Sequence, residues 1–238
     1  MYFDQRDFDI KCEWELPGIE RLSPYSDVII IVDVLSFSTC VDVAVKNGAL
    51  VYPYRWRDGT AEAFAASIGG VLARSRRQAC GGYSLSPVSL LSIPAGTRLV
   101  LPSPNGSALS TATGQLPTFA GCLRNARAVA MAAEQTGKRI SVIPAGEKWP
   151  DGNLRPAIED LIGAGAIISH LSGKRSPEAE VAVAAFISAQ SHLLQTFQQC
   201  GSGREMIDIG FGSDIDLAVA LNQSNCAPLL REGAYMSM

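Results

Sequence analysis

The stretch from Asp27 to Cys40 constrains the fold most, because it joins an apolar run to a turn rich in hydroxyls. Residues 28–32 read Val-Ile-Ile-Ile-Val. A continuous run of this kind is typical of a strand buried on both faces, which favours a parallel sheet covered by helices. Ligands of such sheets bind beyond the carboxyl ends of the strands. We therefore expect chemistry at the polar residues that follow this run: Asp33, Ser36, Ser38 and Thr39.

Strand and helix patterns alternate along almost the whole chain, which predicts a three-layer α/β/α fold with a mostly parallel central sheet. We interpret the 238 residues as a single α/β domain, or alternatively as two closely packed lobes of about residues 1–115 and 116–238. The predicted strands are 8–14, 27–33, 49–54, 97–102, 116–121, 139–144 and 227–230. The predicted helices are 36–47, 61–68, 125–135, 157–171, 177–199 and 214–221, with a short one after residue 107.

Some segments carry turn signals in place of a clear period. Residues 15–26 contain Pro17-Gly18 and are predicted to be a linker, and residues 201–213 a glycine-rich loop. Residues 233–238 are expected to be frayed. Pro53 moves the strand at 49–54 toward a sheet edge, because proline cannot donate to the ladder.

Composition and charge exclude several classes of function. The net charge is −3 and no basic run is interleaved with aromatic residues, so we expect no nucleic-acid partner. No apolar run is long enough to cross a bilayer and no signal peptide is visible, so we expect a cytoplasmic protein without a membrane partner. The scattered cysteines read as reduced thiols, and His170 and His192 lie in helical patterns, which disfavours a zinc site and histidine catalysis.

Two further features are each open to two interpretations. Arg74, Arg76, Arg77 and Arg98 either face an anion or form a solvated surface, and we favour the surface. Pro104-Asn105-Gly106-Ser107 offers free N–H groups at a helix start and a glycine without a side chain, which suits phosphate. Asn-Gly is also the commonest turn dipeptide, so an ordinary turn remains the alternative.

Acidic residues gather after the strand at 139–144. Carboxylates around a cleft with phosphate-binding turns suit Mg²⁺, a hard ion that bridges phosphate groups. Acids in the first turn of a helix also complement the helix dipole, and this interpretation stays open for Glu159. The acids that two converging strand ends would bring together are Asp33, Glu147, Asp151 and Asp160.

Five motifs stand in one order along the chain: Val32–Cys40 with Asn47–Ala49, Ser103–Ser107, Leu123–Val129, Ala145-Gly146 leading to Ile158–Ile167, and Gly210 with Asp214–Ala218. Over roughly residues 27–230 this order resembles the 2-phosphosulfolactate phosphatase family. The resemblance implies a Mg²⁺-dependent acid phosphatase that hydrolyses 2-phosphosulfolactate to sulfolactate and phosphate, a step toward coenzyme M in archaea. Two features depart from the family pattern. Ser36 stands where the family usually has arginine, and the Gly-Glu-Arg segment is absent near residues 78–83.

Residues and resemblance together predict the site. Asp33, Glu159 and Asp160 are the predicted catalytic residues, and Glu147 and Asp151 join Asp33 and Asp160 as metal ligands. Glu147, Asp151 or Glu159 is alternatively the base that orients water. Phosphate is predicted to bind to Ser38, Thr39, Asn105, Gly106, Ser107 and Gly146.

The first hypothesis is therefore a Mg²⁺-dependent phosphoric monoester hydrolase acting on a small acidic phosphate ester, 2-phosphosulfolactate or a related 2-phospho acid. The second is a catalytically impaired relative that binds phosphate or another anion, or acts as a scaffold. A dinucleotide-binding oxidoreductase is excluded, because no G-x-G-x-x-G follows the first strand. A homodimer is the commonest assembly for an enzyme of this size.

Overall fold

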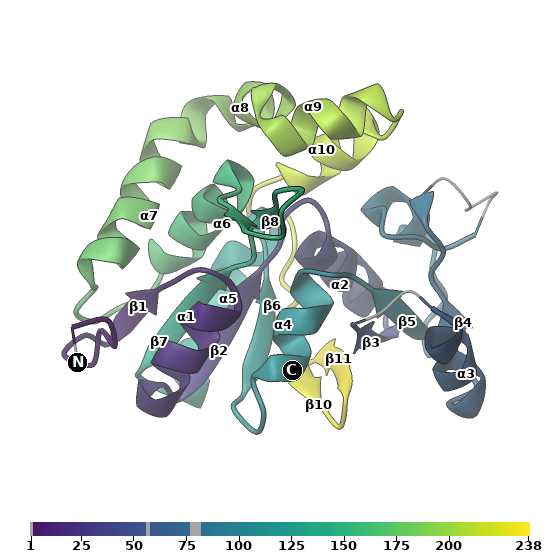
Figure 1. The fold of residues 1–238 in the computed structure, drawn as a ribbon, viewed down its shortest axis with the longest axis horizontal. Helices are drawn as coiled ribbons and strands as arrows, with labels where there is room; N and C mark the ends of the chain where they lie inside the picture. The colour runs from purple at the N-terminus through teal and green to yellow at the C-terminus, as the bar shows by residue number, and fades with distance from the viewer. Residues whose placement is uncertain (1, 56–57, 77–81) are drawn as a thin grey trace.

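The computed structural model describes residues 2–55, 58–76 and 82–238, and its centre is one large sheet (Figure 1). The strand order is β1-β7-β2-β6-β10-β11-β3-β5-β4. The strands of this sheet are β1 (Ile10–Cys12), β2 (Val28–Val32), β3 (Leu50–Tyr54), β4 (Val71–Leu72), β5 (Arg98–Pro102), β6 (Thr118–Gly121), β7 (Ile140–Pro144), β10 (Pro228–Arg231) and β11 (Ala234–Ser237). A separate hairpin joins β8 (Glu147–Lys148) and β9 (Leu154–Arg155).

Helices cover both faces of the sheet, as the alternating pattern predicts. They are α1 (Glu15–Leu22), α2 (Phe37–Lys46), α3 (Gly59–Ser67), α4 (Gly106–Ala112), α5 (Ala126–Thr136), α6 (Ile158–Ile168), α7 (Pro177–Ala189), α8 (Leu193–Gln199), α9 (Gly201–Asp208) and α10 (Gly212–Ala218). Short 3₁₀ turns lie at Ser23–Tyr25, Pro87–Leu90, Leu123–Asn125 and Gln190–His192.

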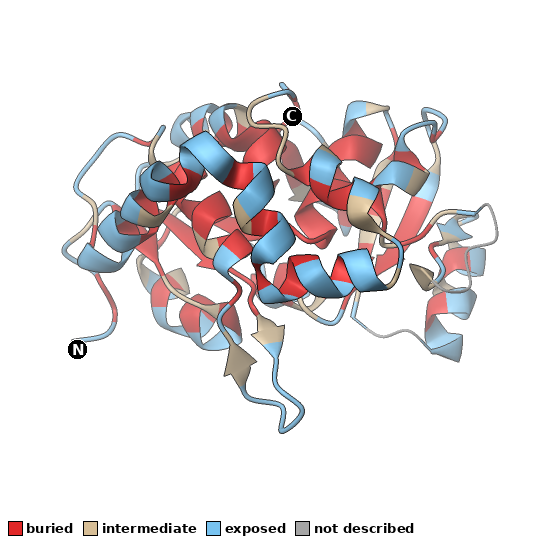
Figure 2. Ribbon diagram, turned by 90° about the horizontal axis from the view of Figure 1, so that it is seen from above, coloured by how far each residue is buried: buried red, intermediate tan, exposed pale blue. Residues whose placement is uncertain are grey.

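The side chains of β2 show how the layers form. Ile29 and Ile31 share an apolar cluster with residues of α1 and α4 on one face. Their neighbours Val28, Ile30 and Val32 pack with α5, α6 and α7 on the other. Figure 2 shows these strands buried between helices whose outer sides are exposed. The predicted three-layer α/β/α fold is confirmed.

The sheet is mostly parallel but contains one reversal. β1, β7, β2 and β6 pair in parallel, and so do β3, β5 and β4. The hairpin β10–β11 lies between these blocks and is antiparallel to β6 and to β3. Strands from before and after residue 115 therefore belong to one sheet, in which β1 and β2 pair with β7, and a boundary at that residue would divide it.

Two predictions near the chain ends are wrong because tertiary packing outweighs local signals. Residues 15–22 form α1, not a linker, and Pro17 fits in its first turn, where a backbone N–H has no helical partner. The expected frayed end instead contains β11, whose Tyr235 is fully buried. The hydroxyl of Tyr235 lies 2.7 Å from Ser110 Oγ, so the last strand is tied to α4.

Three other predictions are also corrected. The expected loop at 201–213 contains α9, which buries Met206, followed by the start of α10. The predicted helix 177–199 is interrupted at Gln190–His192. Pro53 does not place β3 at an edge, because β3 lies between β11 and β5.

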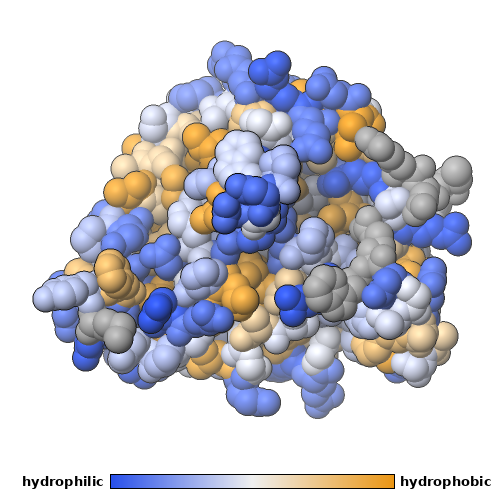
Figure 3. Space-filling model, in the orientation of Figure 1, coloured by the Kyte–Doolittle hydropathy of each residue, from blue (hydrophilic) through white to orange (hydrophobic). Residues whose placement is uncertain are grey.

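The surface in Figure 3 is mixed, with polar atoms over most of it and apolar atoms in the region of α7. Val181 and Ile187 are among the exposed apolar side chains of that helix. In the part of the chain that the structure describes, no helix is long and apolar enough to cross a membrane.

Candidate active site

Three strand-end turns meet at the carboxyl end of β2. Gly106, which begins α4 after β5, donates its N–H to Asp33 Oδ2 at 2.9 Å. Gly146, which follows β7, donates its N–H to Asp160 Oδ2 at 2.9 Å. The N–H of Val34 donates to Asp160 Oδ1 at 2.7 Å. The structure thus brings Asp33 and Asp160 together from opposite halves of the sequence.

Asp33 also binds the first residue of α2. Its Oδ1 accepts the N–H of Phe37 at 3.1 Å, which satisfies an amide at the helix start. Ser36 makes no capping bond with its side chain, and the Ser38 hydroxyl accepts the N–H of Asp33 at 3.0 Å. The carboxylate of Asp33, four residues before Phe37, therefore takes the capping role at the start of α2.

Glu147 and Glu159 complete the acidic cluster. Asn105 Nδ2 donates to Glu147 Oε2 at 2.9 Å, which links the turn after β5 to the β8–β9 hairpin. Glu159 is buried at the start of α6, where the thiol of Cys200 lies 3.6 Å from its Oε2. Asp33, Glu147, Glu159 and Asp160 therefore share one region of the fold.

Burial and mutual repulsion change the acidity of this cluster. Burial raises the pKa of Asp33 and Glu159 raises it further, although N–H groups of Phe37 and Gly106 act in the opposite direction. Burial, together with Asp33 and Glu159, holds the pKa of Asp160 well above its ordinary value. Burial and then Asp33 raise the pKa of Glu147 to about 7. Asp33, Glu147 and Asp160 thus resist ionisation first because they are buried and then because other carboxylates are near, and a bound cation would relieve that repulsion.

Three predicted phosphate-binding hydroxyls have another role. Ser38, Thr39 and Ser107 are each 0% exposed. Their hydroxyls donate to backbone carbonyls, Ser38 to Ile31, Thr39 to Val34 and Ser107 to Leu101. In this structure these hydroxyls are satisfied inside the turns that they close.

The two predicted phosphate-binding glycines donate to carboxylates. The N–H groups of Gly106 and Gly146 are engaged by Asp33 and Asp160. At Gly106 an added Cβ would lie 2.2 Å from the Phe37 ring and 2.8 Å from Asp33 Oδ2. Gly146 has a φ of +65°, a conformation that favours glycine. These glycines allow close approach of backbone to acid, and the amides expected to bind phosphate are occupied in this structure.

Asp151 lies outside the cluster. It is exposed in the turn between β8 and β9, which projects from the body in Figure 2. Its carboxylate accepts the backbone N–H of Asn153 at 3.0 Å and the side-chain amide of Asn153 at 2.9 Å. The structure therefore separates Asp151 from the other predicted metal ligands.

The remaining acids fit Mg²⁺ by chemistry without forming a complete cage. Within residues 2–55, 58–76 and 82–238, no group of three or more His, Cys, Asp and Glu side chains is placed to hold a metal ion. Mg²⁺ usually needs one or two protein carboxylates, with water and substrate phosphate completing its shell. Asp33 and Asp160 meet that requirement as oxygen donors, and their pKa values are raised first by burial and further by neighbouring carboxylates.

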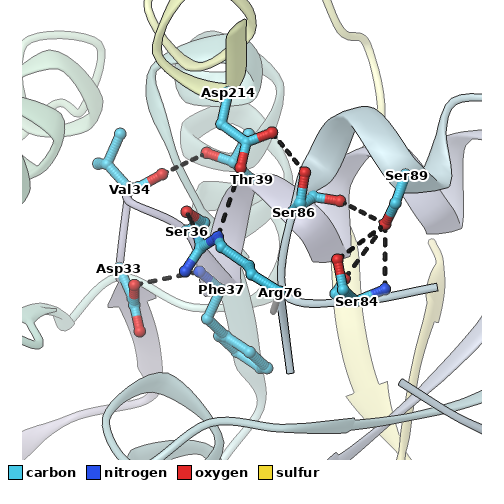
Figure 4. A network of polar contacts seen from close by, with 10 residues as sticks. All are labelled: Asp33, Val34, Ser36, Phe37, Thr39, Arg76, Ser84, Ser86, Ser89 and Asp214. Carbon is cyan, nitrogen blue, oxygen red and sulfur yellow. Dashed lines mark hydrogen bonds and ion pairs between the residues drawn. The ribbon is translucent and has the colours of Figure 1, made fainter. Parts of the chain in front are cut away.

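Sequence reasoning left Arg76 out of the site. Its Nη2 donates to Ser36 Oγ at 2.5 Å, on the same turn as Asp33 (Figure 4). Arg74 and Arg98 are exposed, as expected for a solvated surface, and Arg77 lies outside the described residues. Arg76 follows a segment without periodicity, so the signal available in the sequence was only the local density of basic residues.

Comparison with known proteins agrees with these motifs. A family model described as 2-phosphosulpholactate phosphatase matches residues 18–233. The chain is 29% identical over 214 residues to the 2-phosphosulfolactate phosphatase of Methanothermobacter thermautotrophicus, covering 87% of this chain and 88% of that protein. It is 26% identical over 217 residues to a probable 2-phosphosulfolactate phosphatase of Gloeobacter violaceus, covering 85% and 87%. The chain therefore belongs to the 2-phosphosulpholactate phosphatase family.

Proposed function

We propose that this protein is a Mg²⁺-dependent phosphatase that hydrolyses a small acidic phosphate ester, 2-phosphosulfolactate or a related 2-phospho acid. The observation that carries the proposal is the meeting of three strand-end turns on Asp33 and Asp160 in a chain of this family. The curated relative from Methanothermobacter thermautotrophicus is named for the reaction on 2-phosphosulfolactate.

Asp33 and Asp160 are the residues that would hold Mg²⁺. Each of their four carboxylate oxygens accepts one backbone N–H, which fixes the orientation of both side chains and leaves further lone pairs for a metal. When bound, Mg²⁺ supplies positive charge to the phosphoryl oxygens. Glu159, buried beside them, adds to the negative charge that attracts the ion.

Glu147 is suited to move a proton. Its pKa of about 7 leaves it partly protonated near neutral pH, which matches the requirement for a general acid or base. The amide of Asn105 holds Oε2, so a proton on Oε1 is free to pass to the departing ester oxygen. We assign Glu147 this role in place of metal binding.

Phosphate release from a panel of small esters tests the proposal. The panel contains 2-phosphosulfolactate, 2-phospholactate and neutral phosphate esters, each with Mg²⁺ and with EDTA. We expect release from the 2-phospho acids with Mg²⁺ and loss of release with EDTA. Folded protein that releases no phosphate from any ester with Mg²⁺ would favour the anion-binding alternative.

We also expect a homodimer. The proposed reaction does not depend on it, because one chain contains all the residues assigned above. Size-exclusion chromatography with light scattering measures it directly.

A further inference from the structure

The guanidinium of Arg76 reaches the turn that carries Asp33. Nη2 of Arg76 donates to Ser36 Oγ, three residues after Asp33 and one before Phe37, whose N–H binds the Asp33 carboxylate. The charge of Arg76 acts on Asp33 and opposes the rise in its pKa. Figure 4 shows the side chain of Arg76 lying next to Ser36 and Phe37 at the start of α2.

The residues around Arg76 position its guanidinium but do not fully neutralise its positive charge. Asp214 of α10 is the nearest acid, with Oδ2 3.5 Å from Arg76 Nε, and its other oxygen accepts the hydroxyl of Ser86. In the described part of the chain, Arg76 Nε and Asp214 Oδ2 are buried without a hydrogen-bond partner. The ring of Phe211 lies 5.6 Å from the guanidinium carbon. A bidentate pair would be closer, so Asp214 orients this arginine rather than saturating it.

Arg76 is also within reach of a ligand. Its side chain is 17% exposed and lines a cavity of about 330 Å³ together with Ser84, Ser86 and Ser89. The other lining residues lie in segments 82–89 and 210–213, so an anion in this cavity would meet the guanidinium between the 3₁₀ turn at Pro87–Leu90 and the start of α10.

The site needs such a cation. The amides of Gly106 and Gly146 already donate to carboxylates, and the hydroxyls of the turns point into the fold. A phosphoryl group beside Asp33 would face several acids, and its own charge must be offset. An arginine binds phosphate through two parallel N–H groups, which a serine at position 36 cannot do.

We propose that Arg76 is the residue that binds the phosphoryl group of the substrate, from the segment after β4 and outside the three turns, with Asp214 and Ser36 positioning its guanidinium. This assignment rests on the proposed phosphatase function, because it takes Asp33 as the centre of the reaction.

Direct binding of inorganic phosphate tests the assignment without turnover. Isothermal titration calorimetry compares the wild type with Arg76→Ser and with Arg74→Ser, a control that removes an exposed arginine two residues away, at fixed ionic strength with Mg²⁺ present. We expect the dissociation constant to rise about tenfold or more in Arg76→Ser and to stay unchanged in Arg74→Ser. Adding Ser36→Arg to Arg76→Ser places a guanidinium on the same turn and should restore tighter binding.

A second variant keeps the test valid if Arg76→Ser folds poorly. Removing the arginine leaves the buried Asp214 without its cation, so Arg76→Ser with Asp214→Asn removes both charges. Unchanged phosphate affinity in that folded double variant would overturn the assignment. Weaker binding of lactate with unchanged binding of phosphate would overturn it too, because the arginine would then recognise the acid end of the substrate. Absence of phosphate binding by the wild type would have the same consequence.

Turnover separates the two proposals. If the wild type binds phosphate through Arg76 but hydrolyses no ester, the phosphatase function fails and the assignment of Arg76 as an anion-binding residue stands. If esters are hydrolysed and phosphate binding does not depend on Arg76, only the assignment fails.

Discussion

The N–H of Gly106 donates to Asp33 Oδ2 at 2.9 Å, and this bond joins two strand ends that are 73 residues apart in the chain. It depends on glycine, because a Cβ at residue 106 would overlap the ring of Phe37 and press on Asp33. The orientation of the Asp33 carboxylate therefore depends on glycine at residue 106.

Gly106→Ala tests this dependence. We expect a loss of phosphatase activity of about a hundredfold, because a displacement of about 1 Å at the reacting groups has that effect. The free energy of unfolding should fall by about 1–3 kcal/mol from overpacking. Gly59→Ala is the control, since a Cβ there meets only the far end of Glu62 at 4.0 Å. Full activity of Gly106→Ala would show that the contact is not required.

The raised pKa of Glu147 should make the free energy of unfolding depend on pH. Its pKa rises from 4.5 to about 7 in the fold, so the native state binds more protons than the unfolded state between these values. Stability must therefore fall as the pH rises through that window, by at most about 3 kcal/mol for this group. Glu147→Gln should flatten the curve and be more stable than the wild type at pH values above about 7. Urea denaturation across the window measures both curves, and identical slopes would contradict the assignment.

Substitution of Tyr235 in β11 should have a large effect on the free energy of unfolding. Tyr235 is fully buried and its ring meets Phe37 edge-on, with centroids 6.1 Å apart. Tyr235→Ala should lower the free energy of unfolding by about 3–5 kcal/mol. Tyr235→Phe removes only the bond to Ser110 and should cost about 1 kcal/mol. If thermal and urea denaturation place both variants near the wild type, β11 does not contribute to the core as described.

The ion pair of Arg124 and Asp42 joins α2 to the 3₁₀ turn at Leu123–Asn125. Arg124 Nε lies 2.9 Å from Asp42 Oδ2, and both side chains are buried. Arg124→Met should destabilise the protein by about 3–5 kcal/mol, because it leaves a buried carboxylate without its partner. Arg139→Met breaks an exposed pair with Asp27 and should cost less than about 1 kcal/mol. Equal costs in urea denaturation would be inconsistent with this difference in burial.

Much of the fold follows from local sequence patterns. The runs at β2 and β7 are β-branched and fully buried, so their period and their burial indicate the same structure. Ser176 before Pro177 is a pattern typical of a helix start, and its hydroxyl caps α7 by accepting the N–H of Ala179. The prediction fails where packing across the chain decides, as at Tyr235, whose burial depends on α4 and Phe37 rather than on its neighbours in sequence.

The sequence indicates which acidic residues lie in the candidate site, but not which hydroxyl and arginine side chains contact them. The rule that ligands bind beyond strand ends located Asp33 and Asp160. The pattern of residue types could not show that Ser38 turns its hydroxyl back to Ile31, because that bond depends on the path of the turn. The role of Arg76 could not be predicted for another reason. Its contact with Ser36 joins residues 40 apart, and Arg76 lies in a segment without periodicity.

We expect Asp33 to be required for metal-dependent phosphate release. The most direct test is kcat/KM for 2-phosphosulfolactate, measured against Mg²⁺ concentration for the wild type, Asp33→Asn and Asp208→Asn. Asp208 is exposed at the end of α9, so its variant is a control for the same change of charge. We predict Mg²⁺-dependent turnover in the wild type and Asp208→Asn, with at least about a hundredfold loss in Asp33→Asn. Undiminished turnover by folded Asp33→Asn would contradict the account.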